Sequence, residues 1–310
     1  MNKIALLFSG QGAQAVGMGR DVAAEFPAAA QIWQQADAVL GRPISQTAWN
    51  GPIEELTKTS NAQPALYVDG LALFAALRQL APSFPIEATA GLSLGEWTAH
   101  AAAGTFDFAT GLKLVEQRGQ LMEAACDATA GAMAAMIGAD ETAVRQLAAD
   151  TDVDVANLNA PGQIVISGEA AKVELAVSLA REHGIRRATL LNVAGAYHSR
   201  LMNSAYVQLG DALVDATFQM PAFPVISNVT GAATETLGDI RQSLQDQVTG
   251  TVRWTDCMER LLDRGCDLFI ELGPGAVLAG LAQRIRKGIE VISVSDVPSL
   301  RACAERLGAE

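Results

Sequence analysis

The amino-acid sequence predicts an α/β protein in which a large domain with a mostly parallel sheet carries a smaller inserted domain. Short apolar runs that suit buried strands alternate with Ala-rich stretches of helical length along most of the 310 residues. Between residues 127 and 194 the order of the elements changes to strand, helix, strand, strand, helix, strand. Half of the residues are hydrophobic, which is enough for one large core and a smaller one.

The first part of the chain follows a strand-then-helix pattern. The predicted elements are, in order, a strand at 3–8, a helix at 22–40, a helix at 63–80, a strand at 88–92 and a helix at 96–103. The first helix stops at Gly41-Arg42-Pro43, and Pro82 and Pro85 close the second, because proline cannot continue a helix. The second strand passes through a tight turn at Ser93 into the last of these helices, which is typical of an α/β fold.

The segment from Gly131 to Val193 has a different order. Its predicted elements are strands at 132–137, 153–158, 163–167 and 187–193, with helices at 141–149 and 170–183. The turn Asn159-Ala160-Pro161-Gly162 joins the two middle strands as a hairpin. This β-α-β-β-α-β order is the ferredoxin-like arrangement, so we expect a small ferredoxin-like domain at 127–194. The large domain then comprises 1–126 and 195–310, with further strands at 225–227, 268–271 and 290–292.

The composition excludes several classes of function. With a net charge of −12 and a pI near 4.7, the protein is expected to be repelled by nucleic acid. No apolar run approaches the roughly 18 residues that a membrane helix needs, and the run after Met1-Asn2-Lys3 is too short for a signal peptide. We therefore expect a cytoplasmic protein without membrane contact. The four cysteines have no CxxC spacing, which predicts neither a metal site nor a disulfide framework.

The pentapeptide Gly91-Leu92-Ser93-Leu94-Gly95 is the first candidate for chemistry. It matches the pattern G-x-S-x-G, in which glycines relieve the crowding of a strained serine on a sharp strand-to-helix turn. The hydroxyl is then exposed at the helix N-terminus, where the helix amides face a developing oxyanion. With 28 glycines in the chain, an ordinary Gly-rich turn is the competing interpretation. The position between an apolar strand and a helix favours a nucleophilic Ser93.

A nucleophilic serine needs a base, and the chain has three histidines. His183 ends a predicted helix, where a capping or dipole interaction explains it. His100 follows Ser93 on the same predicted helix, about 10 Å along the axis and too far for direct proton transfer. His198 lies in the small-residue loop Gly195–Ser199, after the last strand of the small domain. We therefore expect His198 to be the base.

A second Gly-rich segment, at 10–15 (GQGAQA), directly follows the first strand. It matches the dinucleotide pattern G-x-G-x-x-[GA], which leaves a dinucleotide-binding oxidoreductase as an alternative. That fingerprint requires a second strand that ends in an acidic residue about 20 residues further on, whereas the segment 26–40 predicts a helix. We therefore expect the loop to supply the second half of an oxyanion hole through the backbone N–H of Gln11.

A set of segments taken together resembles the malonyl-CoA:acyl carrier protein transacylase family. The segments are FSGQGAQ near the N-terminus, GLSLGE at 91–96, QRGQLM at 117–122, GAMAAMIG at 131–138, NLNAPGQIVISG at 157–168, GAYHS at 195–199 and ELGPG at 271–275. Their order and spacing match over nearly the whole chain. The resemblance implies an α/β-hydrolase-like large domain with the inserted ferredoxin-like domain.

The resemblance also implies a role for each residue of the site. Those roles are Ser93 as nucleophile, His198 as its base, the amides of Gln11 and Leu94 as oxyanion donors, Arg118 as the partner of the malonyl carboxylate, Gln247 as the residue whose backbone carbonyl orients His198, and Leu92, Met122, Tyr197 and Asn159 as further residues of the pocket. By spacing alone, Arg118 on an amphipathic helix would be solvated. Only the resemblance predicts that it binds substrate.

The reaction that the resemblance implies has two half-reactions. The malonyl group passes from malonyl-CoA to the phosphopantetheine thiol of an acyl carrier protein of fatty-acid or polyketide synthesis, through an acyl-serine. Coenzyme A enters as part of the substrate, and no separate cofactor or metal is needed. We expect a monomer whose basic cluster Arg284, Arg286 and Lys287 docks the carrier. An acyl hydrolase and a noncatalytic carrier-docking module stay open as alternatives, and Arg118 argues against the hydrolase.

Overall fold

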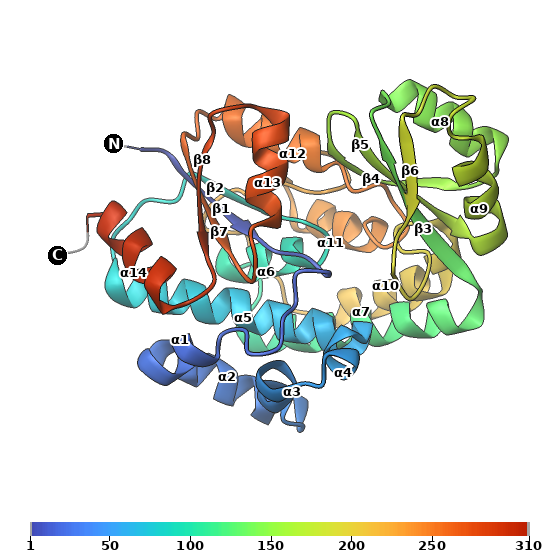
Figure 1. Ribbon diagram of the computed structural model, residues 1–310. Helices are drawn as coiled ribbons and strands as arrows, with labels where there is room; N and C mark the ends of the chain where they lie inside the picture. Colours follow the sequence, from blue (N-terminus) through green and yellow to red (C-terminus); the bar gives the residue numbers. More distant parts are fainter. Residues whose placement is uncertain (1, 309–310) are drawn as a thin grey trace.

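The computed structural model describes residues 2–308 and contains two separate four-stranded sheets (Figure 1). The first sheet is formed by β1 (Ile4–Phe8), β2 (Ala88–Gly91), β7 (Leu268–Leu272) and β8 (Glu290–Val294), in the order β2-β1-β7-β8. All of its strand pairs are parallel. Parallel neighbours need crossover connections, and helices supply them here. The predicted α/β fold with a mostly parallel sheet is confirmed.

The helices around this sheet come from both ends of the chain. They are α1 (Arg20–Glu25), α2 (Pro27–Leu40), α3 (Ile44–Asn50), α4 (Ile53–Thr57), α5 (Thr59–Leu80), α6 (Leu94–Ala102), α7 (Phe108–Ala128), α10 (Asn203–Asp215), α11 (Leu237–Asp246), α12 (Trp254–Asp263), α13 (Val277–Ile285) and α14 (Val297–Arg306), with a 3-10 turn at Arg200–Met202. Among residues 2–308, no helix has both the length and the apolar character needed to span a bilayer.

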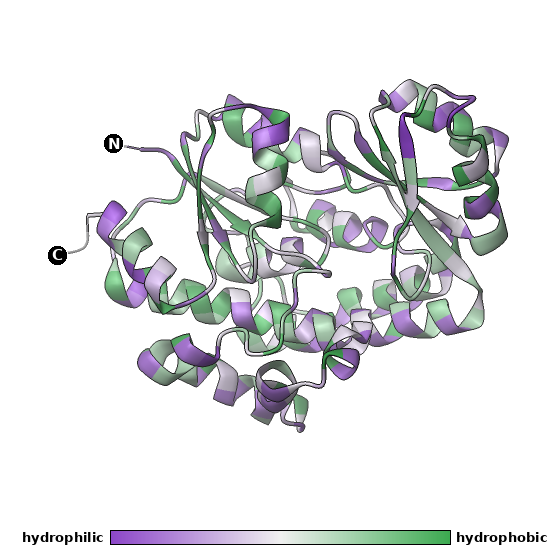
Figure 2. Ribbon diagram, viewed as in Figure 1, coloured by the Kyte–Doolittle hydropathy of each residue, from purple (hydrophilic) through white to green (hydrophobic). Residues whose placement is uncertain are grey.

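Both faces of the parallel sheet are buried under helices. Along β1, Ile4, Leu6 and Phe8 belong to one apolar core, and Ala5 and Leu7 belong to another. Successive side chains of a strand point to opposite faces, so a strand covered on both sides is apolar throughout. α5 and α6 pack on the first face, and α12 and α13 on the second (Figure 1). Figure 2 shows the result as hydrophobic strands at the centre, surrounded by helices with mixed surfaces.

The second sheet consists of β3 (Gly131–Ile137), β4 (Asp154–Ala160), β5 (Gln163–Glu169) and β6 (Arg187–Leu190), all paired antiparallel in the order β4-β5-β3-β6. α8 (Glu141–Asp150) and α9 (Ala170–Leu179) cover one face and share a separate apolar core with it. This strand order confirms the ferredoxin-like arrangement. The domain boundaries, 127–194 against 1–126 and 195–310, stay a prediction.

Some elements differ from the expectation. The helix expected at 22–40 is two helices, because Phe26 is extended (φ −110°, ψ 112°) before Pro27, and a residue before proline is disfavoured in the helical region. The helix expected at 170–183 ends at Leu179. The strand expected at 225–227 forms only isolated bridges, one parallel to Thr89 and one antiparallel to Ala233.

The helix α5 begins at Thr59 rather than at Gln63, although Pro64 lies inside it. Proline has no N–H, so the carbonyl group of Ser60, one turn earlier, lacks its usual partner. Nη2 of Arg42 donates to that oxygen at 3.0 Å. The longer helix brings Thr59 into the candidate site.

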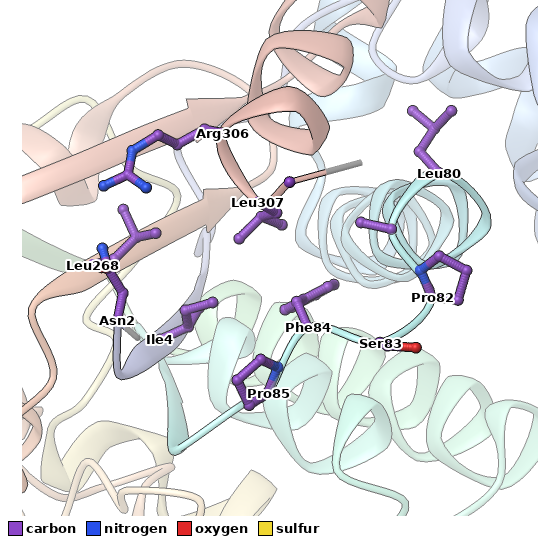
Figure 3. A pocket seen from close by; sticks show the side chains of 12 residues that line it. Asn2, Ile4, Leu80, Pro82, Ser83, Phe84, Pro85, Leu268, Arg306 and Leu307 are labelled. Carbon is purple, nitrogen blue, oxygen red and sulfur yellow. The ribbon is translucent and has the colours of Figure 1, made fainter. Parts of the chain in front are cut away.

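A cavity of about 420 Å³ opens where the parallel strands begin (Figure 3). Ile4 of β1 and Leu268 of β7 line it together with Phe84 and Leu307. Ser93 instead follows the carboxyl end of β2. The cavity therefore lies at the opposite edge of the sheet from Ser93.

The buried carboxyl group of Asp69 is expected to make the free energy of unfolding depend on pH. It is 1 % exposed in α5, and neither oxygen has a hydrogen-bond partner among residues 2–308. Burial and the nearby charge of Asp21 raise the pKa of Asp69 to about 8. The folded state therefore keeps a proton that the unfolded state loses near its ordinary pKa of 3.8, so stability falls as the pH rises between these values. Asp69→Asn removes this loss.

We expect urea titrations to show that Asp69→Asn raises the free energy of unfolding near pH 9, and that the gain shrinks toward about pH 5. Asp211→Asn, on the exposed face of α10, serves as the control and is expected to show no such trend. An Asp69→Asn gain of equal size at both pH values would contradict the prediction.

Candidate functional site

Ser93 lies on the sharp turn between β2 and α6. Its φ of 53° and ψ of −105° are in a region that residues with a side chain rarely adopt. Two glycines make the turn possible. A Cβ on Gly91 would lie 2.0 Å from the carbonyl group of Gly95, and a Cβ on Gly95 would lie 2.1 Å from the carbonyl oxygen of Phe8. The G-x-S-x-G spacing therefore lets α6 pack directly on β1 with Ser93 at its N-terminus.

His198 contacts the Ser93 hydroxyl directly. Its Nε2 lies 2.8 Å from Ser93 Oγ, and its Nδ1 lies 2.8 Å from the backbone carbonyl oxygen of Gln247. A carbonyl oxygen only accepts, so Nδ1 carries the proton, and Nε2 of the neutral ring faces the serine with a lone pair. Burial and the charge of Arg118 lower the pKa of His198 to about 4, against the opposing effect of the Gln247 hydrogen bond. The ring is therefore neutral near pH 7.

The side chain of Gln247 is fully buried and joins several parts of the site. Its Nε2 donates to the backbone carbonyl of Ser93 at 2.9 Å and to Glu96 Oε2 at 2.5 Å. Its Oε1 accepts from Arg118 Nη2 at 3.0 Å and from Trp97 Nε1 at 3.2 Å. We call these hydrogen bonds, together with the bond from His198 to its backbone carbonyl, the Gln247 network.

Arg118 is only 1 % exposed, in contrast to the solvated position that spacing alone indicates. Nη1 donates to Gln63 Oε1 at 2.6 Å, and Nη2 donates to Ser93 Oγ at 3.1 Å and to Gln247. All of these partners are neutral, and within residues 2–308 no carboxylate contacts the guanidinium. Burial lowers the pKa of Arg118 to about 10, so it keeps its charge near pH 7. A buried cation without an anion favours a ligand that brings a carboxylate.

Backbone N–H groups beside Ser93 are available to a ligand. The N–H of Ser93 itself is occupied, because it donates to Asn228 Oδ1 at 2.7 Å. Those of Leu94, the first residue of α6, and of Gln11, in the loop after β1, have no acceptor within the described chain. β1 and β2 are adjacent, so the two loops leave the same edge of the sheet. Free N–H groups at a helix N-terminus favour a negatively charged oxygen.

A cleft of about 470 Å³ opens at Ser93 and His198, and it is lined by strands of the antiparallel sheet and by loops and helices that pack around the parallel sheet. The further predicted residues Gln11, Leu92, Met122, Tyr197 and Asn159 also line it. The Tyr197 hydroxyl lies 2.5 Å from Thr59 Oγ1, which also accepts from Gln11 Nε2 at 3.2 Å. The aromatic ring is thereby tied to the loop after β1.

One wall of the cleft is α13, through Val277 and Leu281. Glu271, in the ELGPG motif at the end of β7, accepts from the N–H groups of Leu278 at 2.8 Å and Ala279 at 3.0 Å. Groups in the first helical turn have no partner within the helix, so Glu271 caps α13. The motif therefore holds this wall in place.

The structure brings together every residue that the sequence singled out for the site. Ser93, His198, Arg118 and Gln247 are linked by hydrogen bonds, and the others adjoin Ser93 or line the cleft. His100 lies outside the site, with Nδ1 2.9 Å from Thr105 Oγ1. The dinucleotide alternative does not fit, because the loop after β1 runs to α1 at Arg20 and opens no helix at the glycines.

The sequence analysis missed five residues that form hydrogen bonds with the site, namely Thr59, Gln63, Glu96, Trp97 and Asn228. Glu96 stands inside the GLSLGE segment, so the motif itself carried the signal. Thr59, Gln63 and Asn228 are single polar residues outside any motif, and only their burial beside Tyr197, Arg118 and Ser93, respectively, singles them out.

Comparisons with known proteins agree over the whole chain. A family model described as the acyl transferase domain matches residues 5–302. The malonyl CoA-acyl carrier protein transacylase of Bacillus subtilis (strain 168) is 40% identical over 317 residues, which cover 100% of this chain and 99% of that protein. The polyketide biosynthesis malonyl CoA-acyl carrier protein transacylase PksC of the same organism is 41% identical over 296 residues, 93% of this chain and 99% of that protein.

The fold comparison leads to the same group of proteins. The crystal structure of an acyl carrier protein S-malonyltransferase from Vibrio cholerae is 40% identical and superposes with a TM-score of 0.94. The superposition covers 97% of this chain and 99% of that one.

The contact between Gly95 and β1 predicts a large effect of one methyl group. Gly95→Ala places a Cβ against the carbonyl oxygen of Phe8, and the backbone on both sides has no room to yield. We expect a loss of roughly 2 kcal/mol or more in the free energy of unfolding, measured by urea titration. Gly280→Ala in α13 is the matched control, because nothing lies within 4 Å of its added Cβ. It is expected to be neutral or stabilising by up to about 1 kcal/mol, and an equal effect of both changes would refute the contact argument.

Proposed function

This chain belongs to the malonyl-CoA:acyl carrier protein transacylase family and is an S-malonyltransferase, and we propose that Ser93, His198 and Arg118 carry out its reaction. The observation that carries the proposal is that Ser93 Oγ contacts both His198 Nε2 and Arg118 Nη2, at 2.8 Å and 3.1 Å. The nucleophilic oxygen therefore contacts both a neutral base and a buried cation.

The first half-reaction acylates Ser93. His198 Nε2 takes the hydroxyl proton as Ser93 Oγ attacks the thioester carbonyl carbon of malonyl-CoA. The carbonyl oxygen becomes an oxyanion, and the N–H groups of Gln11 and Leu94 are its donors, each worth roughly 3 kcal/mol. The intermediate collapses when the C–S bond breaks, and His198 returns the proton to the sulfur of coenzyme A. Malonyl-Ser93 and free coenzyme A result.

The second half-reaction runs the same steps in reverse on a different thiol. His198 takes the proton of the phosphopantetheine thiol of the carrier, and the sulfur attacks the ester carbonyl of malonyl-Ser93. The C–O bond breaks, and Ser93 Oγ recovers its proton from His198. Since the two thiols use one site in turn, the kinetics are ping-pong. A hydrolase would accept water at this step instead.

Arg118 supports selectivity for a malonyl group. Its direct partners Gln63, Ser93 and Gln247 are neutral, and no carboxylate of residues 2–308 forms an ion pair with it. The terminal carboxylate of malonyl supplies such a partner, and the planar guanidinium suits a carboxylate better than an ammonium does. An acetyl group leaves the cation unpaired, which disfavours it in the transition state.

The basic cluster Arg284, Arg286 and Lys287 is our proposal for carrier docking. All three residues are exposed, at or just beyond the C-terminal end of α13. The same helix lines the cleft at Val277 and Leu281, so Arg284 lies only about 5 Å along the helix axis from the cleft wall at Leu281. The monomeric state and the cytoplasmic location stay predictions. The relatives do not decide whether the carrier protein belongs to fatty-acid or to polyketide synthesis.

Intact-mass spectrometry tests the assignment of Ser93 and Arg118. We expect the wild type to gain one malonyl group from malonyl-CoA and to pass it to a carrier protein that bears its phosphopantetheine arm. Ser93→Ala is expected to gain none, and Arg118→Ala to lose the preference for malonyl-CoA over acetyl-CoA by at least about 100-fold, because the charged pair is lost. Decay of the adduct to free malonate without transfer would identify a hydrolase.

The lowered pKa of His198 predicts the acid limit of the reaction. Protonated His198 cannot accept the serine proton, so the acylation rate constant falls only as the pH drops toward about 4, below the usual 6.5. Rapid quench with acetyl-CoA as donor measures the limit, because acetyl does not engage Arg118. In Arg118→Ala the limit is expected to move to higher pH, since the arginine charge no longer lowers the pKa of His198. A limit near 6.5 in the wild type would rule out this environment for His198.

A further inference from the structure

Glu96 is a buried acid that the reaction above does not use directly. It lies in the first turn of α6 and is fully buried. Its Oε2 accepts from Gln247 Nε2 at 2.5 Å and from the backbone N–H of Asn228 at 3.1 Å. Within residues 2–308 it forms no hydrogen bond to Ser93 Oγ or to the His198 ring, and it does not line the cleft. The hydrogen bonds of its carboxyl group therefore reach the reacting groups only through Gln247 and Asn228.

The hydrogen bond between Glu96 and Gln247 selects one orientation of the Gln247 side-chain amide. A glutamine side chain can exchange its oxygen and nitrogen by a half-turn of the amide group. Here Oε1 faces the donors of Arg118 and Trp97, and Nε2 faces the acceptors of Ser93 and Glu96. The carboxylate oxygen of Glu96 accepts the amide hydrogen, so it favours this orientation over the reverse.

The contact with Asn228 supports the turn that carries Ser93. The Asn228 side chain accepts from Ser93 N–H at 2.7 Å and donates from Nδ2 to the carbonyl of Gly91 at 2.9 Å. It therefore bridges the two sides of a turn whose serine has a positive φ. Glu96 in turn binds the backbone of Asn228 and sets its position.

We propose that Glu96 is a positioning residue for malonyl transfer, acting through Gln247 on His198 and Arg118 and through Asn228 on the turn at Ser93. The inference rests on the proposed function, because it assumes that Ser93, His198 and Arg118 carry out the reaction. The Gln247 network makes the connection physical: Gln247 accepts from His198 Nδ1 with its backbone carbonyl and from Arg118 with its side chain.

The electrostatics of Glu96 support a role beyond packing. Burial raises the pKa of Glu96 to about 7, opposed by the hydrogen bonds from Asn228 and Gln247 and by the charge of Arg118. Its second oxygen, Oε1, is buried without a hydrogen-bond partner among the described residues. An acid in such a place is unfavourable for folding, so its acceptor oxygen is expected to serve the site.

Single-turnover acylation of full-length variants tests the proposal. Wild type, Glu96→Ala and Glu96→Gln are mixed with malonyl-CoA or acetyl-CoA, quenched, and followed by intact mass. We expect Glu96→Ala to lower the malonyl rate constant by about 10- to 100-fold and to reduce the malonyl-to-acetyl ratio, because small displacements of reacting groups are costly. Glu96→Gln keeps an acceptor oxygen and is expected to stay within about threefold of wild type. Glu116→Ala, which removes a partly exposed ion pair with Arg42 outside the cleft, is the control and is expected to match wild type.

Histidine tautomers provide a readout that stability alone does not change. The chain has three histidines, so spectra of protein labelled with nitrogen-15 histidine are simple to assign. We expect the Nδ1–H form of His198 in wild type and Glu96→Gln, and a mixture of both tautomers in Glu96→Ala.

Two results overturn the inference in different ways. If Glu96→Ala lowers only the fraction of protein that acylates, with the rate constant, the malonyl-to-acetyl ratio and the His198 tautomer unchanged, Glu96 is merely structural. If the wild type itself acquires no malonyl group or cannot pass it to a carrier, the proposed function fails, and the inference fails with it.

Discussion

The side chain of Gln247 is buried where segments far apart in the sequence meet, and its hydrogen bonds set the geometry of the site. Its amide binds the backbone of Ser93 and the side chains of Glu96 and Arg118, and its backbone carbonyl binds His198. Each of these groups has a fixed number of donors and acceptors, so the network admits few alternatives. A serine, a base and a cation thereby reach positions that none of them would hold alone.

The charges in this network depend on the exclusion of water. His198 and Arg118 are both buried, and Arg118 is one reason why the histidine stays neutral. In water these effects would be small, because solvent screens the charges. Inside the protein the same guanidinium helps to keep His198 neutral, and it forms no ion pair with a carboxylate of residues 2–308. One buried cation thus serves both the protonation state of the base and the choice of acyl group.

The arrangement of the two sheets explains why the site forms where it does. The loops after β1 and β2 leave adjacent parallel strands at the same edge, which brings the N–H groups of Gln11 and Leu94 toward one place. The His198 loop follows the last strand of the ferredoxin-like sheet, and α13, which packs on the parallel sheet, forms another wall of the cleft. The carboxyl edge of a parallel sheet is a common place for such sites, because loops and helix N-termini converge there.

The sequence by itself determined the elements with strong local signals. The continuous apolar run of β1, the order of the ferredoxin-like segment and the glycines of the G-x-S-x-G turn all follow from short-range sterics and hydrophobic patterning. The choice of His198 over His100 also followed from chain geometry, since His100 lies too far along α6. The break at Phe26-Pro27 was readable in principle from the restriction that proline places on the preceding residue.

Only the tertiary structure decided the burial of Arg118, the direction of the Gln247 amide and the contacts of Glu96, Asn228 and Thr59. These depend on contacts between side chains that are far apart in the sequence, such as Gln247 and Trp97, which are separated by 150 residues. Spacing along a helix predicted a solvated Arg118, because periodicity reports which face a residue occupies and not what packs against that face. Hydrogen bonds between distant side chains have no period in the sequence, so the residues that hold the nucleophile, the base and the cation together emerged only when the fold placed them side by side.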